Sequence, residues 1–289
     1  MSHGITIRRL TAAAVAAAGL LILFYPNISD AWNQKRASEL ATEYEQSVAS
    51  LEDTEVEKIL ADARIYNKAL VGSQVPAAFL EHERKPDPEY EKQLNPTGTG
   101  MMGEVEIPCI NVRIPVRHYA DDLSLERGAG HLPGSSLPVG GDSTHSVITA
   151  HRGLQEMRLF TDLDRVREGN LFYLRILGDT MAYEVDQILT VEPTETSSLA
   201  ITAGKDQCTL VTCTPYALNT HRLLVRGHRI PYGAEEYEEE SAYTAPPSLV
   251  SVRNRIICAA AGVLLAFVLE FSIRSIRNRF IKAAEEEKE

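Results

Sequence analysis

The chain has 289 residues, 44% of them hydrophobic, and a net charge of -11. This length and composition allow one ample hydrophobic core, and they favour a single folded domain over two. The acidic balance argues against a nucleic-acid-binding surface. Part of the acid excess lies in two runs, 235–240 and 285–289, which we interpret as solvated faces.

Residues 1–28 are predicted to form an N-terminal signal or anchor segment. The apolar run Leu10–Tyr25 follows Arg8 and Arg9. Its 16 residues would form about 24 Å of helix, whereas the hydrocarbon core of a bilayer is roughly 30 Å thick. The run is therefore either a signal peptide cleaved after Ala31 or an uncleaved anchor lengthened by its flanking residues. Both alternatives export the residues that follow.

Residues 29–70 are predicted to form a helical lead-in, and residues 71–100 a loop. Apolar side chains recur every three or four positions from Leu40 to Leu51, which is the spacing of one helix face. Four prolines between Pro76 and Pro96 then interrupt regular structure. Long loops in compact domains are often functional, so this loop is a candidate lid.

Residues 101–233 are predicted to form a mainly β domain, either a closed barrel or a sandwich. One helical insert is expected around Glu156–Asp164, where Leu159, Phe160 and Leu163 form an apolar face. The predicted strands are 104–107, 112–116, 146–150, 171–176, 181–191, 209–212 and 222–230.

The remaining chain is predicted to comprise an acidic linker (234–255), a transmembrane helix (256–273) and a cytoplasmic tail (274–289). The apolar run Ile256–Ile273 is interrupted only by Glu270 and is followed by four basic residues within ten positions. The positive-inside rule then favours a cytoplasmic C-terminus, which leaves the central domain on the outer face of the membrane. A buried core helix is the alternative for this run.

Cys213 ends the apolar run that begins at Thr209, directly before the turn at Pro215. Arg222 opens the next apolar run, so antiparallel pairing of the two strands would bring its fixed charge close to the sulfur. The alternative is an inert buried cysteine. Four cysteines do not make a disulfide scaffold at this length, although a bridge between Cys109 and Cys208 stays open.

A cysteine nucleophile needs a proton partner, and histidine is the usual one because its ordinary pKa of about 6.5 is closest to neutrality. His151 directly follows the predicted strand 146–150 and precedes the turn residues Arg152 and Gly153. It is therefore the preferred candidate. The rival histidines are His131, His145, His221 and His228.

Several separated motifs, taken together and in this order, resemble the sortases and are most similar to the class C, pilus-building branch. The resemblance covers roughly residues 60–233. The motifs are 103–108 (GEVEIP), 128–134 (GAGHLPG), 148–154 (ITAHRGL), 209–216 (TLVTCTPY) and 219–227 (NTHRLLVRG).

The resemblance implies an eight-stranded sortase-type β-barrel with N-terminal helices and flanking transmembrane segments. It assigns Cys213 as the nucleophile, His151 as the acid/base, and Arg222 as the stabiliser of the substrate backbone and oxyanion. Thr212, Thr214 and Asn219 lie in the same motifs and are candidate contacts to substrate or lid. No cofactor or metal is implied.

Class C sortases carry a lid in which an Asp-Pro-aromatic motif covers the active site, and this chain is similar at Asp87-Pro88-Glu89-Tyr90. The aromatic residue comes one position late. The resemblance implies that Asp87 meets Arg222 and that Tyr90 covers Cys213. An ordinary proline turn is the alternative.

The implied activity is that of a membrane-anchored cysteine transpeptidase of a Gram-positive cell surface. It would cleave an LPXTG-like sorting signal through a Cys213 thioester and pass the acyl group to a pilin lysine. A housekeeping sortase, which attaches surface proteins to an amine of the cell-wall precursor, is the nearest alternative. A papain-type cysteine peptidase and a non-catalytic surface adhesin are the others, but no papain-like cysteine motif is found.

Overall fold

The computed structural model describes residues 35–73, 86–154 and 157–232, with isolated positions between 18 and 33 and between 257 and 266. The chain divides into two compact units, Asp30–Ala245 and a second unit of Met1–Ser29 with Pro246–Glu289. Among the described residues, no helix combines the length and the apolar character needed to cross a membrane. The predicted spans Leu10–Tyr25 and Ile256–Ile273, the acidic linker and the tail lie largely outside those residues.

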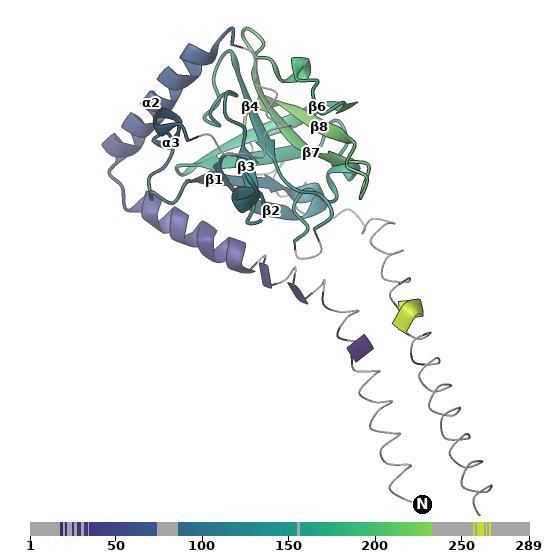
Figure 1. Ribbon diagram of the computed structural model, residues 1–289. Coiled ribbons are helices and arrows are strands. Elements are labelled where there is room, and N and C mark those ends of the chain that lie inside the picture. The colour runs from purple at the N-terminus through teal and green to yellow at the C-terminus, as the bar shows by residue number, and fades with distance from the viewer. Residues whose placement is uncertain are drawn as a thin grey trace, which may run out of the picture. The chain divides into compact units, whose positions relative to one another are not determined.

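The larger unit is built on a closed barrel of eight strands, which confirms the eight-stranded barrel of the predicted fold class (Figure 1). The strands follow one another around the barrel in the order β1-β2-β3-β4-β7-β8-β6-β5, and β5 pairs with β1 to close it. The strands are β1 (Met101–Ile107), β2 (Val112–His118), β3 (Ala129–His131), β4 (Thr144–Thr149), β5 (Leu171–Ile176), β6 (Asp179–Val191), β7 (Asp206–Thr214) and β8 (His221–Ile230).

β3 was not among the predicted strands, and its glycine explains why. Gly130 is the central of only three residues, and glycine weakens a strand signal because it has no side chain to pack. Its hydrogen is nevertheless required, since a Cβ there would lie 2.1 Å from the Tyr119 carbonyl oxygen. A close tertiary approach therefore selects a residue that local propensity disfavours.

The lead-in consists of two helices, not one. Residues 35–49 are helical, the chain turns at 50–52, and α2 (Asp53–Leu70) follows (Figure 1). The first helix docks on the barrel through Tyr44, whose hydroxyl donates to the Met102 carbonyl at 2.7 Å. α2 docks through the Asn67 amide, which donates to and accepts from the Leu137 backbone at 3.0 and 2.7 Å.

The described part of the predicted loop 71–100 contains one short helix, α3 (Pro88–Glu91), and residues 74–85 lie outside the described ranges. The helical insert predicted around Glu156–Asp164 is wrong. The segment forms turns, with Leu159 in the left-handed region at φ 40°, and ends in a 3₁₀ helix at Leu163–Arg165. Its apolar side chains are buried as expected, but packing against the barrel and not helix periodicity directs them inward.

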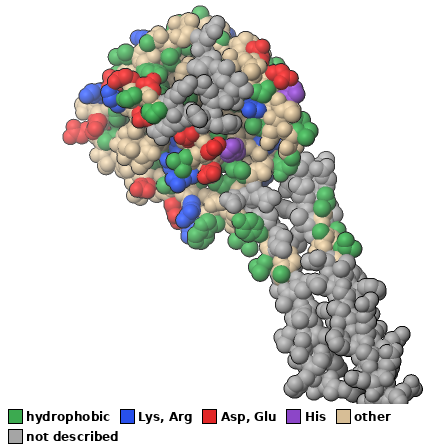
Figure 2. Space-filling view, in the orientation of Figure 1, with side chains coloured by type: hydrophobic (Ala, Val, Ile, Leu, Met, Phe, Trp, Pro, Cys, Tyr) green, Lys and Arg blue, Asp and Glu red, His purple; other side chains and the backbone are tan. Residues whose placement is uncertain are grey.

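Other short elements also lie between the strands, so the expectation of a single insert does not hold. Asp121 caps α4 (Asp122–Leu125), and its carboxylate accepts the Ser124 N–H at 2.9 Å. Two further 3₁₀ helices are η1 (Pro108–Ile110) and η3 (Ser197–Leu199). On the face drawn in Figure 2, acidic and basic side chains of the described residues are interspersed.

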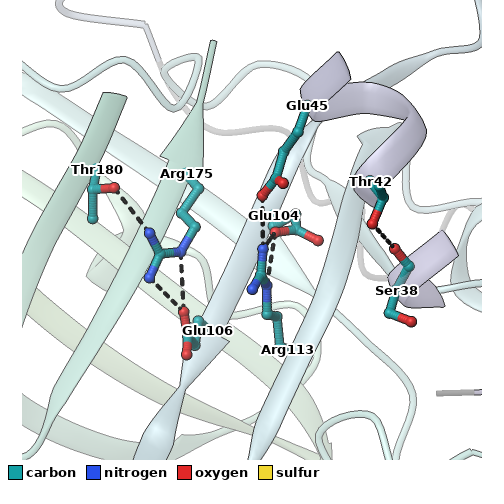
Figure 3. Close-up of polar contacts among 8 residues, drawn as sticks. All are labelled: Ser38, Thr42, Glu45, Glu104, Glu106, Arg113, Arg175 and Thr180. Carbon is teal, nitrogen blue, oxygen red and sulfur yellow. Dashed lines mark hydrogen bonds and ion pairs between the residues drawn. The ribbon is translucent and has the colours of Figure 1, made fainter. Parts of the chain in front are cut away.

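Ion pairs line the outer side of β1 and β2, where the first helix packs (Figure 3). Arg113 donates to Glu104 through Nε and Nη2, at 2.9 and 2.7 Å, and its Nη2 also reaches Glu45 on the first helix at 2.9 Å. One strand away, Arg175 binds Glu106 in the same two-pronged manner. Glu45, Glu104 and Arg113 border a cavity of about 290 Å³ between the first helix, the β1–β2 hairpin and residues 157–159.

Arg113→Met is expected to lower the free energy of unfolding by about 3 kcal/mol at pH 7, because it leaves the buried Glu104 carboxylate without a counter-charge. Burial already raises the pKa of Glu104, so protonation should relieve the deficit as the pH falls toward 5. Glu45→Gln is the matched control. Its pair with Arg113 is exposed, and its loss should cost less than about 1 kcal/mol. Urea titrations at both pH values check this, and equal losses for the two variants would contradict it.

Candidate active site

Cys213 and Arg222 face each other across neighbouring strands. β7 and β8 pair antiparallel, and the register sets Cys213 directly opposite Arg222. The expected pairing of these two strands is therefore confirmed. Side chains of directly opposed residues extend from the same face of a sheet, so the guanidinium and the sulfur share one face.

His151 lies level with Cys213 on the other side. β4 and β7 run parallel, with Thr149 paired to Val211, and the Ala150 N–H continues the ladder by donating to the Val211 carbonyl at 3.1 Å. His151 and Cys213 each lie two residues beyond this last pair, so they occupy equivalent positions at the ends of the two segments.

The three side chains belong to the outer face of the barrel. Alternation along β7 and β8 assigns Cys213 to the face of Val211 and Arg222 to that of Leu224, and both apolar residues lie in a small satellite cluster outside the main core. Leu199 of η3 covers part of this cluster. Cys213, His151 and Arg222 are each partly exposed at its edge.

The rival histidines are occupied elsewhere. His131 and His145 are buried, and burial lowers the pKa of both, that of His131 to about 4. His145 lies on β4 with its ring nitrogens 3.0 Å from the Ala200 carbonyl and 2.7 Å from the Thr209 hydroxyl. His221 pairs with Glu192 at 3.1 Å, and His228 lies toward the far end of β8 beside Asp186.

The other candidate residues of the motifs hold the site together. The buried Thr212 donates its hydroxyl to the Ala150 carbonyl at 2.8 Å, next to His151. The Thr214 hydroxyl accepts from Arg152 at 3.0 Å. Asn219 adopts a left-handed turn, at φ 55°, in the exposed β7–β8 loop, and its carbonyl accepts a long bond of 3.4 Å from Arg222 Nη1. Arg222 also donates to the His221 carbonyl at 3.2 Å.

Tyr90 does not cover the sulfur, so the lid interpretation of this residue is wrong. It is 1% exposed and packs between His118, Tyr119 and His131, with its hydroxyl 2.7 Å from His131 Nδ1. Asp87 is the N-cap of α3, and its carboxylate accepts the N–H groups of Glu89 and Tyr90. This is the ordinary proline turn of the alternative interpretation, because an Asp-Pro sequence is well suited to begin a helix.

The Tyr90–His131 contact predicts a loss of stability in acid. His131 Nε2 donates to the Ser136 carbonyl at 2.9 Å and Nδ1 accepts from Tyr90, which requires a neutral ring. Its pKa of about 4 lies below the ordinary 6.5, so this contribution is complete above pH 6.5 and is lost as the pH falls toward 4. The expected loss is about 3 kcal/mol, measured by denaturant unfolding between pH 7.5 and 4. His131→Gln should flatten that dependence and the exposed control His221→Gln should not; an unchanged slope in His131→Gln would refute the interpretation.

Cys109 and Cys208 are both buried and neither is in a disulfide, so the bridge left open by the sequence does not form. Cys208 lies in the main core cluster, on the opposite face of β7 from Cys213. Burial raises the pKa of its thiol well above the ordinary value. Cys213 is free and partly exposed, which leaves it as the accessible thiol among the described cysteines.

A closed barrel that presents an accessible thiol between an imidazole and a guanidinium defines a class of cysteine enzymes that act on acyl groups. The sortase-domain profile matches residues 105–230. Sortase C1 from Streptococcus agalactiae is 44% identical, with a TM-score of 0.63, and the match covers 68% of this chain and 100% of that one. The chain belongs to the sortase family, in its class C branch.

Another solved structure agrees with this assignment, and curated proteins agree with the family. Sortase C from Streptococcus pneumoniae is 42% identical with a TM-score of 0.64, and the match covers 68% of this chain and 98% of that one. Sortase A of Streptococcus agalactiae is 28% identical over 150 residues, which are 50% of this chain and 59% of that protein. Sortase A of Staphylococcus aureus is 30% identical over 132 residues, 44% of this chain and 62% of that protein. The chain thus spans less than two thirds of these curated relatives.

Proposed function

We propose that this chain is a membrane-anchored cysteine transpeptidase that cleaves an LPXTG-like sorting signal and joins the acyl fragment to a pilin lysine. The observation that carries the proposal is the row formed by three neighbouring strands. His151 follows the end of β4 by two residues, β7 carries Cys213 and β8 carries Arg222 opposite it. Each group in this row has a chemical task in peptide-bond exchange.

In the first half-reaction, the Cys213 thiolate attacks the carbonyl carbon of the threonine-glycine bond. The carbonyl oxygen becomes an oxyanion, and the Arg222 guanidinium with backbone N–H groups opposes its charge. His151 then protonates the glycine nitrogen as the C–N bond breaks. The products are a free glycine amine and a thioester between Cys213 and the threonine acyl group.

In the second half-reaction, an amine attacks the thioester and His151 accepts the proton that the amine loses. The C–S bond breaks, an amide forms, and the Cys213 thiolate is regenerated. The thioester retains enough acyl reactivity for this exchange without ATP, which suits chemistry outside the cell. Tethering enzyme and substrate to one membrane surface would raise their effective concentration and favour the amine over water.

The class C relatives favour a pilin as the substrate. The S. pneumoniae structure is described in terms of pilin substrate specificity, and another neighbour, 40% identical, is a pilus-related sortase C of Group B Streptococcus. The curated sortase A relatives keep a housekeeping role, with a cell-wall precursor amine as the acceptor, as the second candidate. The extracellular location and the C-terminal cytoplasmic tail rest on the apolar runs of the sequence.

The test is intact-protein mass spectrometry of the purified chain incubated with an LPXTG-type peptide. We expect a mass increase equal to the acyl fragment, located on the tryptic peptide that contains Cys213. A lysine-bearing pilin peptide should resolve the adduct faster than water does, and an oligoglycine or precursor-type amine should resolve it more slowly. The reverse order of acceptors would favour the housekeeping role. Hydrolysis alone would indicate a peptidase, and no adduct would indicate a binding protein.

Modification by a thiol reagent tests whether Cys213 is accessible and reactive in the folded chain, even when no peptide adduct forms. Sortase C1 of S. agalactiae has been crystallised in complex with the methanethiosulfonate MTSET, which shows that that protein binds such a reagent. We expect Cys213 to be modified in this chain and the buried Cys109 and Cys208 to be spared while the chain is folded.

A further inference from the structure

The backbone ladder between β4 and β7 ends before it reaches the reacting groups. The last paired residues are Thr149 and Val211, and the Ala150 N–H donates to the Val211 carbonyl. His151 and Cys213 each lie two residues beyond that pair. Side-chain contacts connect the two segments there, and one of them is the bond from the Thr212 hydroxyl to the Ala150 carbonyl, directly before His151.

On the far side, Arg152 connects the two chain segments. It directly follows His151, and its Nη1 donates at 3.0 Å to the hydroxyl of Thr214, which directly follows Cys213. Its Nη2 forms an ion pair with Asp164, at the 3₁₀ helix Leu163–Arg165. The Arg152 side chain is 6% exposed, so the guanidinium is shielded from water and its bonds are stronger than surface contacts.

The backbone around Arg152 is held as well. The Phe160 N–H donates to the His151 carbonyl at 3.2 Å, and the Gly153 N–H donates to the Thr161 hydroxyl at 3.0 Å. Gly153 has φ 84°, and a Cβ there would lie 3.0 Å from the Tyr216 ring. The segment after His151 is thus bonded to residues 160 and 161 and lies close against Tyr216, in the turn after Cys213.

We propose that Arg152 is a positioning residue, which holds His151 at working distance from Cys213 by binding Thr214 while Asp164 fixes its guanidinium. The proposal rests on the proposed transpeptidase function. Arg152 acts through its own place next to His151 and through Thr214, which directly follows Cys213. A displacement of about 1 Å between reacting groups can cost about 100-fold in rate.

The test removes the two ends of the Arg152–Thr214 bond in turn. Thr214→Val keeps the shape of the side chain and loses the acceptor, and Arg152→Met loses the donors. Each should lower the rate of thioester formation by about 10-fold to 100-fold with little change in KM. The double variant should be no slower than the slower single variant, because both remove one bond. Thr214→Ser, which keeps the hydroxyl, should recover most of the rate.

A second readout does not depend on any peptide substrate. The rate at which Cys213 reacts with methyl methanethiosulfonate is measured from about pH 5 to about pH 9 for each variant and for His151→Gln. This range spans the ordinary pKa values of an imidazole, about 6.5, and of a thiol, about 8.5. Thr214→Val and Arg152→Met should move the pH profile toward that of His151→Gln. Arg158→Met is the matched control, since Arg158 pairs with Asp162 inside the same loop. It should lower the melting temperature and leave the profile unchanged.

The outcomes are distinguishable. A parental profile and a parental acylation rate in Thr214→Val would overturn the positioning role. A raised KM at a parental kcat would also overturn it, because that result assigns Thr214 to substrate binding. If the parent forms no thioester with any peptide but the profiles move as expected, the transpeptidase function fails and the positioning of the pair stands.

Discussion

Cys213→Ala is expected to abolish thioester formation completely, which is the largest effect predicted for this chain. The alanine cannot form the acyl bond, and no other described thiol can replace it. Cys109 and Cys208 are buried in the main core, and alternation along β7 turns Cys208 away from the site. The barrel should keep its stability, since Cys213 is partly exposed and lies at the end of its strand. Mass spectrometry after incubation with an LPXTG-type peptide measures the result.

Cys208→Ala provides the matched control on the same strand. It removes a thiol five positions away on the opposite face, and it should lower stability slightly because it leaves a small cavity in the core. Its thioester should form at the parental rate. A thioester retained in Cys213→Ala, or lost in Cys208→Ala while the fold persists, would contradict the assignment of the nucleophile.

His151→Gln is expected to lower kcat/KM for peptide exchange by about 100-fold to 10,000-fold, the usual contribution of a general acid/base. Glutamine can form a hydrogen bond but cannot deliver a proton to the departing amine or accept one from the attacking amine. The loss should therefore appear in both half-reactions. Single-turnover acylation and separate resolution of the preformed thioester by a lysine peptide measure the two steps independently.

His221→Gln is the control for this prediction. His221 lies on β8 at the same edge of the barrel, opposite Thr214 of β7, but its ring is directed to Glu192. Its replacement should change kcat/KM by less than about threefold, as for an exposed side chain outside the chemistry. Equal losses in the two variants would mean that register alone does not identify the proton carrier.

Much of the barrel was predictable from local pattern. Seven of the strands lie within β-branched or apolar runs, and Leu171–Ile176 was predicted with its observed bounds. β3 was missed because two glycines and a histidine dominate its surroundings, whereas its place depends on β2 and β4. The insert before β5 was misassigned because its buried apolar residues imitate one helix face.

The candidate site divides in the same way. The pairing of Cys213 with Arg222 follows from two adjacent strands joined by a short loop. It could therefore be predicted from residues that are close together along the chain. His151 was preferred over four other histidines from its place after a predicted strand, whereas the parallel pairing of β4 with β7 that supports this choice joins segments about 60 residues apart. Tyr90 was misassigned because its sequence motif carries no information on burial.

The sequence by itself determined the class of fold, the strand runs, and the cysteine and arginine that face each other, because these depend on residues close together along the chain. The tertiary structure alone decided that Tyr90 is buried, that Asp87 caps a helix, and that Arg152 reaches Thr214 across the barrel edge. The physical reason is that these contacts depend on strand register and burial, which arise only once distant segments have packed together.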